Sequence, residues 1–188
     1  MVYDEDKKLV QEVLAGNIDS FNILINKYEM IVLRFIYGII KDKEASEDIS
    51  QETFITVYNK LYQYNNEYKF SNWILQIAKN KALDYIRKFR RVYEANIEEC
   101  VDLKSNEKSP EESYEYKETK GYIRKFIDSL DTIDKQIFIL RYSNEKTFFE
   151  ISEILDMKES TVKRHYYNAR EEFLKIYKKN IGGEGYGL

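Results

Sequence analysis

The sequence is poor in residues that break helices, with one proline and seven glycines in 188 residues, and it has no sustained alternation rich in Val and Thr. Strand-rich and βαβ folds need frequent turns, and turns depend on Gly and Pro, so this scarcity predicts an all-helical protein. The single cysteine, Cys100, excludes an internal disulfide and fits a reducing compartment.

Residues that build catalytic and metal sites are also scarce. The chain has one histidine and one cysteine, and it lacks a glycine-rich phosphate-binding loop and a cluster with metal-ligand spacing. His165 is more typical of a helix-surface residue than of a ligand. We therefore expect a protein that is not an enzyme and that needs neither a metal nor a cofactor.

No stretch of the sequence has the length and apolarity of a membrane span. The most apolar run, IVLRFIYGII, is interrupted by Arg34, and the first ten residues, MVYDEDKKLV, lack the apolar core of a signal peptide. Hydrophobic residues make up 43% of the chain, which is enough for packed cores. We expect no membrane insertion and a cytoplasmic location.

Charge is distributed unevenly along a chain whose formal net charge is −3. Residues 92–118 hold nine acidic residues, three lysines and the single proline, without a sustained apolar period. Loops beyond about 15 residues are uncommon inside one domain, so this stretch is typical of a tether. We predict two small helical domains, residues 1–91 and 119–180, joined by a flexible acidic linker at 92–118 and followed by a disordered tail at 181–188.

The N-terminal domain is expected to contain four helical segments. Gly16 is placed to end the first, Asp19 or Ser20 can cap the second, and Ser71 can cap the fourth. The core stripe of the second is predicted to be Phe21, Leu24, Ile25, Tyr28, Val32, Phe35 and Ile39. The third, Glu44–Tyr62, should face inward through Ile49, Phe54, Val57, Tyr58 and Leu61.

The fourth segment is a basic helix. Six basic residues and one Asp lie between Lys79 and Arg91, and Trp73 falls on the polar side of the helix. The opposite side, predicted to be buried, holds Ile74, Leu75, Ala78, Ala82, Tyr85, Ile86 and Phe89. Aromatic and amide side chains beside basic ones suit single-stranded nucleic acid, because bases stack on rings while cations follow the phosphates. The alternative is a solvated helix face whose Trp73 folds over the edge of the core.

The C-terminal domain has the pattern of a helix-turn-helix. After helices near Lys120–Ser129 and Ile133–Tyr142, a short helix at Phe148–Leu155 is expected to be capped by Thr147. A turn at 156–158 then leads into a long helix that starts at Glu159. Its outer side carries hydroxyl, basic and amide groups, as a recognition helix in the major groove requires. An antiparallel helical hairpin without a DNA role is the alternative.

Together, these motifs resemble a bacterial RNA polymerase sigma factor of the extracytoplasmic-function (ECF) group. The stretch DISQETF is similar to the segment of region two that docks on the clamp helices of the largest polymerase subunit. The stretch WILQIAKNKALDYIRK is similar to the segment that melts and reads the minus-ten element. LDTIDKQIFILRY followed by TFFEISEILDMKESTVKRHYYNAR resembles region four, which reads the minus-thirty-five element. The chain departs from the family at Asp131, usually proline, and at Asp156, usually glycine.

The resemblance implies three groups of functional residues and three partners. Polymerase docking would fall to Asp48, Gln51, Glu52 and Phe54, of which Phe54 is also a candidate core residue. Minus-ten DNA would be contacted by Asn65, Asn66, Tyr68, Phe70, Trp73, Lys79, Asn80, Arg87 and Arg91. Minus-thirty-five DNA would be contacted by Ser160, Thr161, Lys163, Arg164, Tyr167 and Asn168. The partners implied are core RNA polymerase, promoter DNA and an anti-sigma factor.

The alternative function is a free-standing helix-turn-helix regulator that binds operator DNA without polymerase. Such a regulator would leave the Trp73 surface without a role, and the N-terminal domain lacks the βαβ pattern of a receiver domain.

Overall fold

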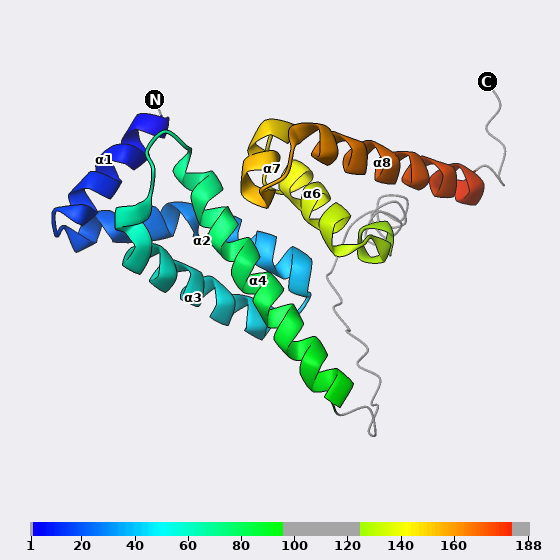
Figure 1. The fold of residues 1–188 in the computed structure, drawn as a ribbon, viewed down its shortest axis with the longest axis horizontal. Helices are drawn as coiled ribbons and strands as arrows, with labels where there is room; N and C mark the ends of the chain where they lie inside the picture. Colours follow the sequence, from blue (N-terminus) through cyan, green and yellow to red (C-terminus); the bar gives the residue numbers. More distant parts are fainter. Residues whose placement is uncertain (1, 96–124, 182–188) are drawn as a thin grey trace, which may run out of the picture.

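The computed structural model describes residues 2–95 and 125–181, so most of the predicted linker and the tail lie outside the described residues. All regular structure in these two ranges is helical, as predicted (Figure 1). The elements are α1 (Val2–Leu14), α2 (Ile18–Ile40), α3 (Lys43–Lys60), the 3-10 turn η1 (Leu61–Gln63), α4 (Phe70–Ala95), α6 (Thr132–Tyr142), α7 (Phe148–Leu155) and α8 (Glu159–Ile181). Residues 125–129 are helical as well. Helix α4 ends at Ala95, so the N-terminal domain extends past the boundary that was predicted at residue 91.

Helices α1 to α4 form the N-terminal domain around the predicted stripe of α2. Phe21, Leu24, Tyr28, Val32, Phe35 and Ile39 of that stripe are buried, and Ile25 is half-buried. The predicted cap of α2 was wrong, because Asn17 is the N-cap and its side chain accepts a hydrogen bond from the Asp19 backbone N–H. Gly16 has φ +100°, a conformation that glycine adopts without strain, and it lets the chain turn from α1 into α2.

Helix α1 is fastened to α2 by a buried carboxylate. Asp6 is 4% exposed. Its two oxygens accept hydrogen bonds from Lys27 Nζ at 2.6 Å and from Tyr28 Oη at 2.5 Å. Burial, followed by the bond to Asp6, raises the pKa of Tyr28, so the phenol keeps its proton and remains a donor.

We expect Asp6→Ala to lower the free energy of unfolding by about 1–3 kcal/mol, because the Tyr28 hydroxyl would lose its acceptor inside the core. Urea denaturation followed by circular dichroism measures this change. Glu5→Ala is the matched control, since the Glu5 side chain is 67% exposed and lies 3.5 Å from Lys27. Equal unfolding midpoints for the two variants would contradict the prediction.

The C-terminal domain confirms the predicted helix-turn-helix. Thr147 caps α7 and forms a capping box with Glu150. Asp156 ends α7 in the left-handed conformation, with φ 55°, and Asp131 caps α6. Both acidic residues thus occupy positions where short polar side chains are tolerated or favoured.

Three further details of the predicted N-terminal domain were wrong. Tyr58 is 47% exposed and Phe89 is 55% exposed, although periodicity placed both on inward faces. The end of α4 that carries Phe89 projects beyond α2 and α3 (Figure 1), so the apolar side of the helix runs past the helices that cover it. Ser71 lies inside the first turn of α4 rather than at its cap, and the Lys69 carbonyl accepts the first helical bonds from Asn72 and Trp73.

The two domains pack against each other. Helix α7 lies against α4, and α6 lies against α2 (Figure 1). Ile74 and Leu75 of α4 belong to the same buried cluster as Ile151 and Ile154 of α7. A single apolar core therefore joins segments far apart in the sequence. Within residues 2–95 and 125–181, no helix is long and apolar enough to cross a membrane.

Candidate nucleic-acid interface

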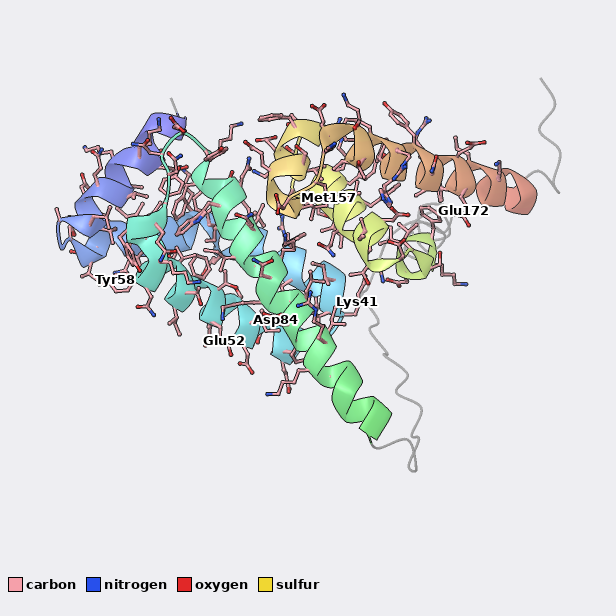
Figure 2. The ribbon with its side chains drawn as sticks, in the orientation of Figure 1. Lys41, Glu52, Tyr58, Asp84, Met157 and Glu172 are labelled. Carbon is pink, nitrogen blue, oxygen red and sulfur yellow. The ribbon has the colours of Figure 1, made fainter. Side chains whose placement is uncertain are left out.

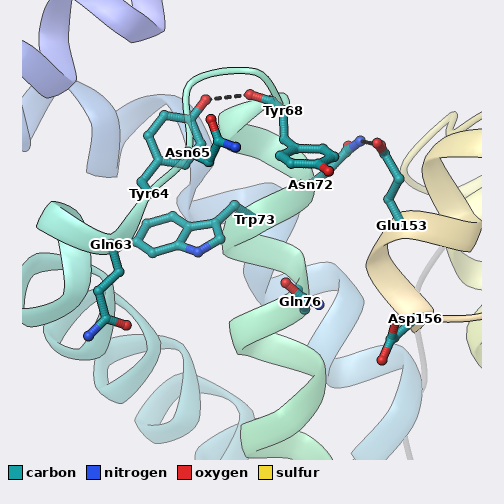
Figure 3. A pocket seen from close by; sticks show the side chains of 9 residues that line it. All are labelled: Gln63, Tyr64, Asn65, Tyr68, Asn72, Trp73, Gln76, Glu153 and Asp156. Atoms are coloured by element: carbon teal, nitrogen blue, oxygen red, sulfur yellow. Dashed lines mark hydrogen bonds between the residues drawn. The ribbon is translucent and has the colours of Figure 1, made fainter.

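A pocket of about 420 Å³ opens where the loop after η1 meets the start of α4 (Figure 3). It is lined by Gln63, Tyr64, Asn65, Tyr68, Asn72, Trp73, Gln76, Glu153 and Asp156. Rings and amides alternate on the side contributed by the N-terminal domain, and two carboxylates come from the C-terminal domain. Three residues predicted to contact minus-ten DNA line this pocket: Asn65, Tyr68 and Trp73. Asn66 follows Asn65 in the same loop but is not part of the lining.

Three aromatic rings form one wall of the pocket and its support. The Trp73 ring centroid lies 5.3 Å from that of Tyr64 and 5.8 Å from that of Phe70. Phe70 is 0% exposed, which removes it from the predicted DNA contacts and makes it the core residue on which Trp73 rests. Trp73 is half-buried, so it both packs on the core edge and presents surface to the pocket.

The loop in front of Trp73 is shaped by its own hydrogen bonds. The Tyr64 hydroxyl donates to the Tyr68 carbonyl at 2.5 Å, and Asn65 Oδ1 accepts from the Glu67 backbone N–H at 3.0 Å. Tyr68, 51% exposed, stands at the rim of the pocket. The loop therefore presents its rings and amides from a defined turn.

The polar side of α4 is less uniform than the sequence suggested. Asn80 is exposed, as predicted, whereas Arg87 pairs with Asp84 at 3.0 Å. Lys79 is half-buried, and its pKa is lowered by burial, against an opposing effect of Asp156 in the C-terminal domain. The side chain of Arg91 lies outside the described residues.

The outer face of α3 carries acidic, amide and apolar side chains. Asp48, Gln51 and Glu52 are exposed, and Glu52 lies on the side of α3 that faces away from the C-terminal domain (Figure 2). Phe54 is 7% exposed, so its side chain fills the core instead of reaching a partner. Sequence reasoning missed Ile55, which is 62% exposed on this face. Its position seven residues after Asp48 and three after Glu52 is the signal that could have revealed it.

The outer face of α8 presents the predicted recognition residues. Ser160, Lys163, Arg164, Tyr167 and Asn168 are exposed, and Thr161 is half-buried. Lys163 is held 2.7 Å from Glu159, and the hydrogen bond to Glu159 raises the pKa of Lys163. His165 lies 2.7 Å from Asp134, so it ties α8 to α6. That pairing was not apparent from sequence, since 31 residues separate the two.

The chain matches two family models, in the order of its two domains. Residues 24–92 match Sigma-70 region 2, and residues 120–173 match Sigma-70 region 4. The chain is 28% identical to the ECF RNA polymerase sigma factor SigW of Bacillus subtilis, over 90% of this chain and 95% of that protein. It is 29% identical to SigM of the same organism, over 81% of this chain and 92% of that protein.

Solved structures share the fold. CnrH, in complex with the cytosolic domain of CnrY, aligns with a TM-score of 0.69 at 17% identity, over 93% of this chain and 98% of that one. The sigma factor RpoE of Bartonella quintana, in complex with the anti-sigma factor NepR, aligns with a TM-score of 0.70 at 15% identity, over 84% of this chain and 96% of that one.

The region 2 match accounts for the N-terminal domain, which a free-standing helix-turn-helix regulator would leave without a role. Proteins of this family are sigma factors, which are not enzymes. With region 2 and region 4 both present and in order, the chain belongs to the sigma-70 family as an ECF sigma factor, an alternative sigma factor that directs transcription initiation by RNA polymerase.

Proposed function

We propose that three surfaces of this chain divide the work of initiation. The outer face of α3 binds core polymerase, the pocket and the adjoining face of α4 bind unpaired minus-ten DNA, and the outer face of α8 reads the minus-thirty-five element. The observation that carries the proposal is the pocket, which places aromatic and amide groups directly in front of a basic helix. On this division, the domain that ends with α4 opens the promoter and the domain at 125–181 anchors it upstream.

The α3 face suits a protein partner. Exposed Ile55 lies among Asp48, Gln51 and Glu52, an apolar contact surrounded by polar groups. Interfaces commonly combine an apolar centre with a polar rim. Carboxylates in the rim favour a partner surface with basic side chains. The resemblance noted in the sequence assigns this partner as the clamp helices of the largest polymerase subunit, and Ile55 takes the place first given to Phe54.

The pocket suits an unpaired base. Trp73 and Tyr68 offer ring faces for stacking, and Asn65 and Gln76 offer amides for the base edge. Asn80 continues this surface along α4, with Lys79 and Arg87 beside the path of the backbone. Phe70 acts by supporting Trp73 rather than by touching DNA.

We extend two further properties to this chain. RpoE was solved with the anti-sigma factor NepR, and CnrH with the cytosolic domain of CnrY, and we propose an anti-sigma factor for this chain as well. Recovery of polymerase subunits alone from native extracts would contradict that partner. We also propose a cytoplasmic location, because the polymerase works there.

The proposal is tested by transcription with purified core polymerase from a library randomised across the promoter. We expect selection of two separated sequence blocks. Arg164→Ala should relax selection at one base pair of the upstream block by about 1–3 kcal/mol, if the guanidinium is bidentate to guanine. Arg170→Ala, exposed on the same helix, is the control. Equal loss across all sequences would make Arg164 a phosphate contact, and selection without an upstream block would overturn the role of α8.

A further inference from the structure

Helix α8 is tied to α6 by side chains on both of its flanks. Asp134 Oδ1 lies 2.7 Å from His165 Nδ1, and the Tyr142 hydroxyl lies 2.7 Å from the Tyr166 hydroxyl. Asp134 is in the first turn of α6, whereas Tyr142 is its last residue. His165 and Tyr166 are neighbours in α8, and successive side chains of a helix point about 100° apart. These four residues, which we term the double tie, therefore hold α8 at one level from two sides.

The bond between Asp134 and His165 is directional and shielded from water. An ionised carboxylate has no hydrogen to give, so the imidazole Nδ1–H is the donor. The two side chains are 19% and 26% exposed, and hydrogen bonds are electrostatically stronger where water is largely excluded. The bond thereby fixes which ring nitrogen of His165 carries the hydrogen, as well as where the ring lies.

The bond between Tyr142 and Tyr166 is supported by ring packing. Phe138 of α6 stacks on Tyr166 with ring centroids 5.3 Å apart, and it lies 5.7 Å from the Tyr142 ring. Burial, followed by the bond to Tyr142, raises the pKa of Tyr166, so its hydroxyl keeps its proton at neutral pH. Tyr166 also lies edge-on to Tyr167, a proposed DNA contact, at 5.3 Å. Movement of the Tyr166 ring would therefore displace a side chain that faces DNA.

The apolar contact between α6 and α8 does not by itself fix the rotation of α8. Val162 and Ala169 are buried on the inner side of α8, but hydrophobic attraction is non-directional. A helix with its side chains is about 10–12 Å across, so a turn of about 20° about its axis moves a side-chain tip by about 2 Å. That displacement would break a bond of the double tie. It would also turn Arg164 and Asn168 away from the base edges that they are proposed to read, because such contacts are short and directional.

We propose that the double tie sets the rotation of α8 and thereby its base specificity, with Asp134 and Tyr142 as positioning residues that act through their partners on α8. The inference rests on the proposed function of α8. It assigns a role to His165 and to the two ends of α6, none of which belongs to the predicted groups of DNA contacts. Loss of either bond is expected to weaken sequence selection while affinity for DNA of any sequence is retained.

The first measurement is sequence selection by the full chain bound to core polymerase, with the upstream block of the promoter randomised. We expect Asp134→Ala and Tyr142→Phe each to lower the enrichment of the preferred upstream block by about fivefold, the lower end of what one good base contact supplies. Asp134→Asn should keep most of the selection, because its amide oxygen still accepts from His165. A change of charge acts on all sequences alike, so it cancels in this ratio. Ile133→Ala, 42% exposed beside Asp134, is the matched control.

The outcomes separate the double tie from the proposed function. Parental selection in every variant would overturn the inference, and so would an equal loss across all sequences. If Asp134→Ala does not fold, as circular dichroism would show, His165→Ala replaces it. A failure of the proposed function looks different, because the parent would then select no upstream block and Arg164→Ala would have nothing to relax. The double tie would in that case have no specificity to set.

The second measurement observes the bond to Asp134 directly. His165 is the only histidine in the chain, so histidine labelled with nitrogen-15 reports on this ring alone in a nuclear magnetic resonance spectrum. At basic pH, where a free imidazole is neutral, we expect the hydrogen on Nδ1 in the parent, in Tyr142→Phe and in Asp134→Asn. Asp134→Ala should move it to Nε2. A hydrogen on Nε2 in the parent would overturn the double tie whatever the promoter selection shows.

Discussion

Asp48→Lys/Glu52→Lys is expected to abolish co-elution of the protein with core RNA polymerase on a sizing column. Both carboxylates are exposed on the outer face of α3, so the substitutions reverse the charge of a proposed interface without disturbing the core. Like-charge juxtaposition across an interface costs several kcal/mol, which corresponds to a loss of affinity of about 100-fold or more. Glu52 lies 3.2 Å from Lys81, so the variant also removes an exposed ion pair of small value.

Glu5→Lys/Glu29→Lys is the matched control, because it makes the same change in net charge at exposed positions of α1 and α2. It should co-elute with polymerase like the parent. Stoichiometric binding by the α3 variant would show that polymerase is contacted elsewhere. If the parent itself failed to bind polymerase but bound duplex DNA tightly alone, the Trp73 surface would be reduced to a packing role.

Trp73→Ala is expected to reduce promoter opening by roughly 10- to 100-fold, while closed-complex formation changes much less. The reason is that one base–ring stack is worth about 1–3 kcal/mol, and stacking becomes available only once the strands separate. Permanganate reactivity of unpaired thymines measures opening, and gel mobility at low temperature measures the closed complex. A promoter with a pre-melted bubble should recover part of the lost activity.

Two further variants distinguish a loss of base stacking from a loss of folding stability. The Trp73 ring packs on Tyr64 and Phe70, so its removal also costs core packing. Trp73→Phe retains a ring there and should keep most of the opening activity. Phe35→Leu, a change in the core stripe of α2 outside the pocket, should lower thermal stability without a selective effect on opening. Unchanged melting by Trp73→Ala would contradict the assignment.

Features set by local chemistry could be predicted from the sequence. The cap of α7 depends on neighbours a few residues away, and Thr147 caps the helix as predicted. The stripe of α2 is equally local, because the helical period decides which side chains share a face.

Features that depend on contacts between segments distant in the sequence could not be predicted. Phe89 lies on the apolar side of α4 yet is exposed, because this end of α4 extends beyond α2 and α3. Phe70 stands beside pocket residues in the sequence and is nevertheless buried. The pairing of Lys69 with Glu150 spans 81 residues, and no spacing in the sequence marks it. The periodicity of the sequence therefore could not predict how the two domains pack against each other.

The Glu150 carboxylate, at the contact between the two domains, has two sets of partners. Glu150 Oε2 accepts from the Thr147 backbone N–H at 2.8 Å, while Oε1 faces Lys69. Burial alone would raise the pKa of Glu150, but bonds from the Thr147 backbone N–H, Lys69 and the Thr147 hydroxyl lower it to about 2. A lowered pKa means that the stabilisation from the charged Glu150 is fully present above the unfolded pKa of about 4.5 and is lost as pH falls toward 2. Mild acidification would therefore leave the carboxylate charged.

The consequence concerns how this protein can vary over evolution. A substitution at Glu150 would remove the contact with Lys69 and weaken the N-terminal cap of α7 at the same time. The contact between the domains and the stability of α7 therefore cannot change independently at this position. Lys69 and Glu153 make contacts between the domains but do not cap a helix. Changes that tune the contact between the domains should therefore accumulate at those two positions, while Glu150 is also required as part of the capping box of α7.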